Sequence, residues 1–422
     1  MPITLRIALR FLLAKRGAMM MSLAGIALGV GFIVLTQAIT SGFQGFFIQT
    51  ILGADGAIRV EDKIQQLETA IEAETVGKVP KTNNGPSNSV KVESGRTYIE
   101  GVSEPRLQIA AIARLSEVTG ISEVVRGNVM VQSATREESA QVFGINLNDH
   151  LKVSDLGKQI VMGSASDFQE SPSGVMLGTV LAQRLKARLG DSVLIAYAGQ
   201  STRYKVAAIY ETGVRDIDRT RVFMHLGEAR TLLQRPFGAT FLQVSLRNPD
   251  RAPELAALIE NITEHRSTSW KEREQVWLQV FFFFRILAAI TVSTIIFVSG
   301  LGMLNTLAMI VMEKTKEIAI LRSMGFTRRD IAATFMLQGA LVLAAGLSLG
   351  WVFGALCTMG TEHVPIQVHG IFTTDHVVVA WELSHYVLAG ILASVVVVIA
   401  SWFPARRAAH MEPADIIRGA SQ

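Results

Sequence analysis

Four of the eight histidines offer the clearest candidate for metal chemistry in this sequence. His363, His369, His376 and His385 lie within one 23-residue stretch. Their spacings of 6, 7 and 9 residues match no metal-ligand template. We therefore interpret this stretch as a solvated loop rather than as a metal or pH-sensing site, and expect no metal ion.

Catalytic and nucleotide-binding motifs are missing from the sequence. It contains neither H-E-x-x-H nor G-x-S-x-G, and its one cysteine, Cys357, cannot form a zinc-binding pair. Gly77-Lys78 and Gly157-Lys158 do not sit in a G-x-x-x-x-G-K-[ST] loop. We expect a chain that is not an enzyme and binds no cofactor of its own.

A charged segment, MEKTKEIAILRSMGFTRRDI, separates two long apolar runs. Its first part, Glu313–Met324, is predicted to be a short helix, because Gly325 suits the left-handed position after a helix end. Ile318, Leu321 and Met324 would form a narrow apolar stripe flanked by charges. This stripe suits docking onto another protein, although a helical, positively charged membrane loop is the simpler alternative.

The segment lies between helices that are expected to cross a membrane. Hydrophobic residues make up 49% of the 422 residues, charged residues 18%, and the mean hydropathy is +0.34. Since a spanning helix needs about 20 apolar residues, four segments qualify: Gly17–Ile39, Val280–Met312, Phe335–Met359 and Tyr386–Phe403. Thr327 and Asp330 resemble a capping box that begins the third helix.

The basic residues predict the orientation of these spans, because Lys and Arg mark cytoplasmic flanks. Three flanks are basic, whereas residues 360–385 contain no Lys or Arg. We predict a bacterial inner-membrane protein with both termini cytoplasmic. The net charge of +4 then reflects these flanks, and no nucleic-acid partner is implied. The basic flanking residues are Arg6, Arg10, Lys15, Arg16, Lys314, Lys316, Arg322, Arg328, Arg329, Arg406, Arg407 and Arg418.

The long region between the first two spans is predicted to be a periplasmic α+β domain. Alternating segments such as RYKVAAIYETG indicate strands, and VLAQRLKARL indicates an amphipathic helix that buries Val180, Leu181, Leu185 and Leu189. Residues 61–99 are polar and rich in turn residues, which predicts an exposed, mobile insert.

Several motifs together resemble the MacB/FtsX-type ABC transporter permeases, closest to the lipoprotein-releasing LolC/LolE branch. They are TLAMIVMEKTKEIAILRSMGFTRRDIAATFMLQG, RFLLAKR, SGFQGFFIQTILGADGAIRV, VMLGTVLAQRLKARLGDSVLI and PARRAAHMEPADIIRG. The resemblance extends over nearly the whole chain except residues 61–99. It implies a membrane protein with four transmembrane α-helices and a large α+β periplasmic domain between the first and second spans.

In that family the charged segment is a coupling helix that fits a cleft on a separate ATPase dimer, which binds ATP and Mg. The resemblance also implies a second permease copy or paralogue. Carried to this sequence, the ATPase-coupling residues are Glu313, Lys316, Glu317, Ile318, Leu321, Arg322, Met324, Gly325, Arg406, Arg407 and Pro413.

The predicted organisation follows from the spans and the resemblance. It comprises a cytoplasmic interfacial helix (1–16), transmembrane helix 1 (17–42), the periplasmic domain (43–279), transmembrane helix 2 with an outward stalk (280–312), the coupling helix (313–330), transmembrane helix 3 (331–359), a periplasmic loop (360–385), transmembrane helix 4 (386–404) and a cytoplasmic tail (405–422).

Aromatic residues gather near the expected outer ends of the first two spans. They are either lipid-facing rings or the lining of a cleft for acyl chains, with a charged residue that meets a headgroup or carboxylate. The cleft candidates are Phe43, Phe46, Phe47, Phe281, Phe282 and Arg285. The first two spans are expected to continue outward as stalks that transmit movement without a pore.

Three functions fit the resemblance. The first is release of lipoproteins or another lipid-anchored or amphiphilic substrate from the inner membrane. The second is MacB/DevC-type export with a periplasmic adaptor and an outer-membrane channel, and the third is FtsX-like control of a cell-wall hydrolase. In LolC-type proteins a hairpin captures a soluble carrier, but here only AGQSTR joins the two matching strands. The use of a periplasmic carrier is therefore open.

Overall fold

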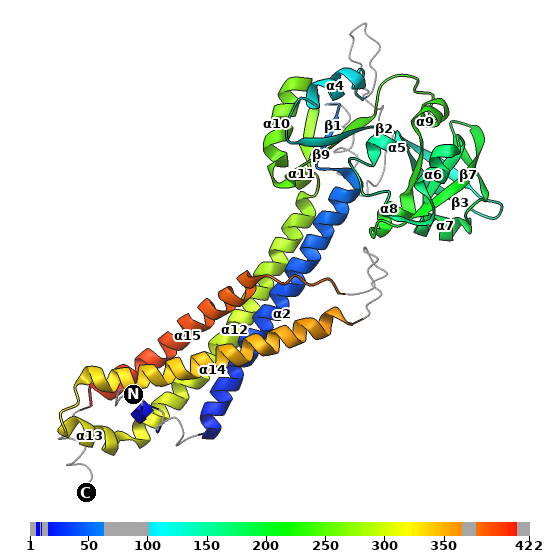
Figure 1. The fold of residues 1–422 in the computed structure, drawn as a ribbon. Helices are drawn as coiled ribbons and strands as arrows, with labels where there is room; N and C mark the ends of the chain where they lie inside the picture. Colours follow the sequence, from blue (N-terminus) through cyan, green and yellow to red (C-terminus); the bar gives the residue numbers. More distant parts are fainter. Residues whose placement is uncertain (1–5, 9, 11–15, 63–100, 365–376, 412–422) are drawn as a thin grey trace, which may run out of the picture. The chain divides into compact units, whose positions relative to one another are not determined.

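The computed structural model describes residues 6–8, 10, 16–62, 101–364 and 377–411 (Figure 1). The chain divides into two compact units. The first comprises Met1–Phe46, Gln279–Ile366 and His376–Gln422, and the second comprises Phe47–Leu278 and Gln367–Asp375. The predicted insert lies outside the described residues except for Glu61 and Asp62, and so does most of the predicted N-terminal helix.

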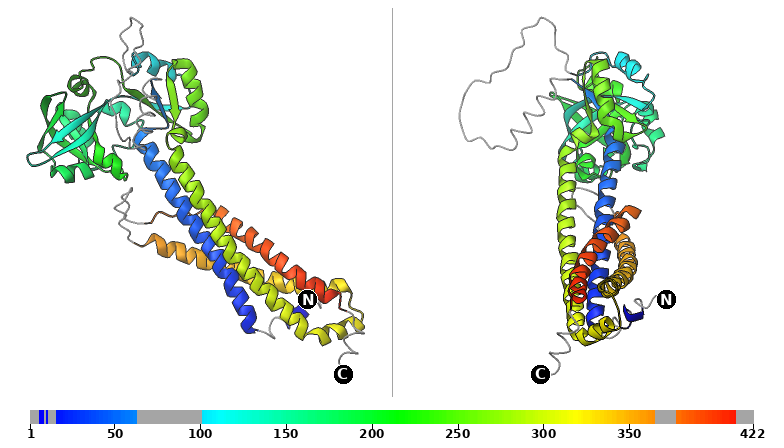
Figure 2. Two further views of the ribbon diagram at one scale, coloured as in Figure 1. Left: turned by 180° about the vertical axis from the view of Figure 1, so that it is seen from behind. Right: turned by 90° about the vertical axis from the view of Figure 1, so that its left-hand side faces the viewer.

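Four long helices run alongside one another (Figures 1 and 2), and the ends of two of them belong to the second unit. They are α2 (Arg16–Asp55), α12 (Gln275–Glu313), α14 (Arg328–Glu362) and α15 (Leu383–Ala409). All four are long and apolar enough to cross a membrane, judged by length and composition. The predicted number of spans is confirmed, and α2 continues through Phe43–Gly53 as expected.

Glycines allow α14 to approach α2 closely. Gly346, Gly350 and Gly354 repeat at every fourth position, so they share one face of α14. A Cβ atom at these positions would lie 2.8, 2.7 and 2.9 Å from side-chain atoms of Ile26, Val30 and Val34, respectively. Since carbon atoms normally stay about 3.5–4.0 Å apart, even alanine is too large here.

The second unit is built on a ten-stranded mixed sheet. Strands β3 and β8, and β5 and β7, pair in parallel, and the other pairs are antiparallel. Strand β6 (Ser192–Tyr197) pairs with β2 and β7 beside the main path. The main order is β10 (Arg266–Ser269), β1 (Ile58–Glu61), β9 (Phe241–Leu246), β2 (Val118–Gln132), β3 (Glu137–Ile145), β8 (Arg221–His225), β5 (Gly174–Gly178), β7 (Gln200–Tyr210) and β4 (Ile160–Gly163).

Short helices cover this sheet, which confirms the predicted α+β class. They are α4 (Pro105–Ile112), α5 (Leu147–His150), α6 (Ala165–Glu170), α7 (Thr179–Leu185), α8 (Arg215–Thr220), α9 (Leu226–Leu232), the 3-10 helix η1 (Pro249–Arg251), α10 (Ala252–Thr263) and α11 (Trp270–Arg273).

The predicted amphipathic helix is shorter in the structure than in the sequence-based prediction. Helix α7 buries Leu181 and Leu185 but ends there, because Lys186 adopts a left-handed conformation with φ of 54°. Leu189 lies beyond the helix and is 45% exposed. The prediction that Leu189 belongs to the buried face is therefore wrong.

The first strand of the unit pairs with its last two. Ile58 of β1 lies opposite Val244 of β9 on one side and Ser269 of β10 on the other. Ile58 and Val60 are fully buried in a core that also contains Trp270. The first strand of the second unit and its last two strands therefore lie side by side in the sheet.

A tight turn joins β6 and β7. Ala198 and Gly199 occupy its two central positions with φ of 47° and 82°. Positive φ at both positions is typical of a two-residue hairpin. The short connection predicted at AGQSTR is confirmed.

Candidate functional site

The candidate coupling segment forms a short, well-defined helix between two long ones. Helix α13 spans Thr315–Ser323, and Gly325 follows with φ of 99°. The amide of Thr327 donates to Asp330 Oδ2 at 2.9 Å, and the amide of Asp330 donates to Thr327 Oγ1 at 3.3 Å. The predicted glycine stop and capping box are both present, so the C-terminal end of α13 and the start of α14 are fixed by local contacts.

One side of α13 packs into the core of the first unit. Ile318 is 1% exposed, Ala319 is 2% exposed, and Leu321 is partly buried against the same core. The prediction that Ile318 and Leu321 form an exposed apolar stripe is therefore wrong. A short helix at the end of a bundle buries its apolar side against the bundle, and the periodicity alone does not reveal which side that is.

Arg322 also faces the bundle rather than solvent. Its Nη1 atom donates to the carbonyl oxygens of Ala409 and Met411 at 3.0 and 2.9 Å. These carbonyls lie at the C-terminal end of α15, where a cation is electrostatically favourable. Arg322 thus connects α13 to the residues at the end of α15.

The opposite side of α13 is exposed and carries both charged and apolar groups. We call it the coupling face; it comprises Lys316, Glu317, Ile320, Ser323 and Met324. Ile320 and Met324 are 57% and 73% exposed and are four residues apart, so they are neighbours on this face. The sequence interpretation missed Ile320, although its spacing from Met324 was a usable signal.

The remaining coupling candidates differ in their environment. Glu313 and Gly325 are exposed at either end of α13, and Arg406 and Arg407 are exposed near the end of α15. The guanidinium of Arg406 lies 5.3 Å from the centre of the Trp402 ring. Pro413 lies outside the described residues.

The six cleft candidates do not share one open surface. Phe43 and Phe281 meet edge to face with ring centres 5.7 Å apart, and Phe281 is only 5% exposed. Phe47 is 2% exposed and its ring lies 5.7 Å from that of Trp277. These buried rings fill space between packed side chains, so the structure gives no open cleft at Phe47 or Phe281.

The other three candidates differ in their exposure and contacts. Phe46 is half-buried and Phe282 is 64% exposed. Arg285 Nη2 donates to Gln44 Oε1 at 2.6 Å, so this intramembrane charge has a polar partner on α2. A role for these residues in binding acyl chains stays a prediction.

The histidine-rich stretch is not uniformly solvated. His385 is 5% exposed at the start of α15, and its Nε2 atom forms a 3.1 Å hydrogen bond with Ser41 Oγ. His363 is exposed, whereas His369 and His376 lie outside the described residues. No group of metal-ligating side chains occurs within the described part of the chain. The interpretation as a solvated loop is wrong for His385.

A buried ionic cluster lies at the C-terminal end of α2, within the second unit. The carboxylate of Asp55 accepts two hydrogen bonds from Arg221, at 2.7 and 3.0 Å, and lies 3.3 Å from Arg59. Gln243 Nε2 donates to the same carboxylate at 3.3 Å. The Arg59 guanidinium also lies 4.5 Å from the ring centre of Phe241. Sequence reasoning missed this cluster because Asp55 and Arg221 are 166 residues apart.

Two other buried groups of the second unit have shifted acidities. Burial raises the pKa of Asp218 to about 6, although hydrogen bonds from the Thr212 amide and hydroxyl oppose this shift. Burial lowers the pKa of His150 to about 4. Ionisation of either side chain in the folded protein is therefore unfavourable near its ordinary pKa.

The four spanning helices, the α+β domain between the first two and the half-exposed helix α13 are the architecture of a membrane permease. The sequence matches the FtsX-like permease C-terminal family over residues 289–413 and the MacB-like periplasmic core domain over residues 19–262. The second match alone covers more than half of the chain. The protein belongs to the MacB/FtsX-type family of ABC transporter permeases.

Three relatives, matched over most of this chain, support this assignment. The chain is 25% identical over 444 residues to the lipoprotein-releasing system transmembrane protein LolC of Neisseria meningitidis serogroup B, which covers 98% of both chains. It is 23% identical over 336 residues to LolE of Haemophilus influenzae, covering 71% of this chain and 77% of that protein. The macrolide export ATP-binding/permease protein MacB of Pasteurella multocida is 21% identical over 96% of this chain and 58% of its own length.

Proposed function

We propose that this chain is the permease subunit of an ATP-driven transporter that releases lipoproteins, or another lipid-anchored substrate, from the inner membrane. The observation that carries the proposal is the similarity to LolC over 98% of both chains. Removing a lipid anchor from the bilayer costs about 0.8 kcal/mol per CH₂, or on the order of 10 kcal/mol for one chain of about fifteen carbons. Such a step needs an external energy source.

That energy enters through the coupling face in this proposal. A separate ATPase dimer binds ATP and Mg and docks on α13, with Ile320 and Met324 as apolar anchors. Lys316 and Glu317 lie beside these anchors and set the orientation of docking through their opposite charges. A second permease, as a copy or a paralogue, completes the complex, and this chain itself performs no catalysis.

The long helices suit transmission of movement rather than formation of a pore. Helices α2 and α12 contain 40 and 39 residues without interruption. At 1.5 Å per residue each is about 60 Å long, twice the roughly 30 Å of a hydrocarbon core. A continuous helix of this length passes displacement from one end to the other.

MacB-type export with a periplasmic adaptor is the second candidate. Two observations favour it: the similarity to MacB over 96% of this chain, and the two-residue hairpin at Ala198 and Gly199. This hairpin leaves no room for the carrier-capturing insertion expected in LolC-type proteins. If lipoproteins are the substrate, another subunit or another surface must engage the carrier.

Purification of the complex in mild detergent distinguishes these candidates. Chains and lipids that accompany the permease are identified by mass spectrometry. Triacylated lipoprotein together with an ATPase supports lipoprotein release, whereas a periplasmic adaptor without lipoprotein supports MacB-type export. Recovery of neither an ATPase nor a second permease contradicts the transporter assignment itself.

The orientation of the chain is tested by cysteine labelling. Cys357 is replaced by serine, and single cysteines are placed at the exposed positions Lys205 and Ser323. An impermeant thiol reagent should label Lys205→Cys in intact spheroplasts and label Ser323→Cys only after the membrane is opened. Labelling of Ser323→Cys from outside contradicts cytoplasmic termini.

A further inference from the structure

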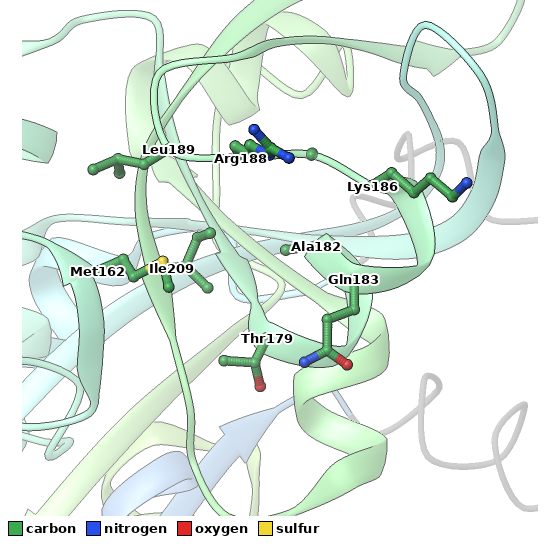
Figure 3. Close-up of a pocket in the computed structure, with 9 residues that line it drawn as sticks. Met162, Thr179, Ala182, Gln183, Lys186, Arg188, Leu189 and Ile209 are labelled. Carbon is green, nitrogen blue, oxygen red and sulfur yellow. The ribbon is translucent and has the colours of Figure 1, made fainter.

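A surface pocket in the second unit lies between α7, the edge strand β4 and strand β7 (Figure 3). Its volume of about 620 Å³ falls within the range of small-molecule sites. It is distant in sequence from the coupling face and from the aromatic residues of the spans. The lining residues are Met162, Thr179, Ala182, Gln183, Lys186, Ala187, Arg188, Leu189 and Ile209.

The apolar and charged groups of this pocket are separated in space. Met162, Ile209 and Leu189 gather on one side in Figure 3, whereas Lys186 lies on the opposite side with its amine directed away from them. Met162 and Leu189 are 55% and 45% exposed, so their apolar surface is available to a ligand. An elongated molecule with one apolar and one charged end matches this arrangement.

The charge of the matching ligand follows from the lining residues. Two of the nine, Lys186 and Arg188, are cationic and exposed, and none is acidic. The nearby carboxylate of Asp191 accepts a hydrogen bond from the backbone amide of Arg188 at 2.7 Å. This bond involves the backbone of Arg188 and not its guanidinium group.

Lys186 directly follows the C-terminal end of α7. Helices commonly end in a left-handed residue that is glycine, because other residues are strained there. Here Lys186 adopts φ of 54° directly after α7. Lys186 is one of the residues that line the pocket.

We propose that this pocket binds a single hydrocarbon chain that ends in a carboxylate, as in a free fatty acid. The chain lies against Met162, Ile209 and Leu189, and the carboxylate faces Lys186 and Arg188. This inference goes beyond the proposed function, since the pocket shares no residue with the coupling face or with the aromatic cleft candidates.

The test uses the full-length protein in lipid nanodiscs and a fatty acid that carries a diazirine group. After irradiation, mass spectrometry measures labelling of residues 160–163 and 179–190 relative to labelling of α12, which reports binding from the bilayer. A matched probe has an alcohol in place of the carboxylate. Two variants alter the pocket, Met162→Asp and Lys186→Gln. Val161→Asp is the control for the first, because Val161 is adjacent in β4, 56% exposed and outside the lining.

Met162→Asp should reduce labelling of the pocket about tenfold, because it places a charge beside the hydrocarbon chain. Val161→Asp should leave it unchanged. Lys186→Gln should weaken labelling by the acid about two- to fivefold, the range of an exposed ion pair, and leave labelling by the alcohol unchanged. Equal labelling of the Met162→Asp and Val161→Asp variants overturns the site. Equal labelling of the wild-type protein by acid and alcohol overturns the carboxylate assignment.

Discussion

Replacement of Asp55 with asparagine removes the carboxylate at the centre of the ionic cluster while keeping a side chain of nearly the same size. The side chains of Asp55, Arg221 and Arg59 are 9%, 13% and 14% exposed, so the cluster is almost entirely desolvated. In the variant, two buried guanidinium groups lose the charge that compensates them. We expect a strong loss of stability in the second unit.

The size of this loss follows from the burial of the pair. Removing one partner of a buried ion pair costs about 3–5 kcal/mol, because the other charge stays buried without compensation. For a domain of about 150–250 residues, each kcal/mol lowers the melting temperature by about 2–4 °C. The Asp55→Asn variant should therefore melt about 6–20 °C below the wild-type protein.

Asp155→Asn provides a matched control. Asp155 Oδ1 lies 2.6 Å from Lys158 Nζ, but the two side chains are 49% and 84% exposed. An exposed pair of this kind contributes about 0–1 kcal/mol, so this variant should melt within a few degrees of the wild-type protein. Thermal unfolding of the full-length chain in detergent is followed by tryptophan fluorescence at one fixed scan rate. A melting temperature of Asp55→Asn equal to that of Asp155→Asn would refute the reasoning.

Three further predictions concern other parts of the chain. Ile320→Asp should abolish co-purification of the ATPase without lowering the melting temperature. Ile318→Asp should lower the melting temperature, because Ile318 is 1% exposed. Recovery of the ATPase at the wild-type level with Ile320→Asp contradicts the assignment of the coupling face. Gly350→Ala should lower the free energy of unfolding by about 1–3 kcal/mol through overpacking. Gly302→Ala should lower it little, because a Cβ atom at Gly302 meets nothing within 4 Å. Equal melting temperatures of the two variants contradict the close contact of α14 with α2. The pKa of Asp218 is about 6 when folded and 3.8 when unfolded, so its contribution to stability is fully present below about pH 4 and is lost as the pH rises through 6. Asp218→Asn should therefore gain up to about 3 kcal/mol relative to wild type between pH 4 and pH 7.5, and a melting-temperature difference that does not change with pH contradicts this.

The spanning helices and the C-terminal end of α13 could be predicted because their signals are local, whereas Glu313, the predicted start of α13, is the last residue of α12. An apolar run of sufficient length identifies a span, and Gly325, Thr327 and Asp330 define helix ends through contacts within a few residues. The α+β class follows from local alternation in the same way. Strand order could not be predicted, since β1 reaches its partners β9 and β10 only after the intervening chain has folded.

The orientation of side chains around α13 shows a different limit. Ile318 and Ile320 are both isoleucine on the same nine-residue helix, yet one is buried and the other is exposed. Periodicity identifies which residues share a side but does not indicate where the rest of the bundle lies. The Asp55 cluster was missed for the same physical reason, because its members come from distant parts of the sequence.

The pairing of β1 with β10 has a consequence for how the protein is made. Ile58 emerges 211 residues before its partner Ser269. At a synthesis rate of about 5–20 residues per second, β1 waits about 10–40 seconds for that partner. During this interval β1 has unpaired edges and an uncovered apolar face, both of which favour aggregation. Synthesis of β10 is followed at once by that of α12, which begins at Gln275, so the sheet becomes able to close just as the second membrane helix is being made.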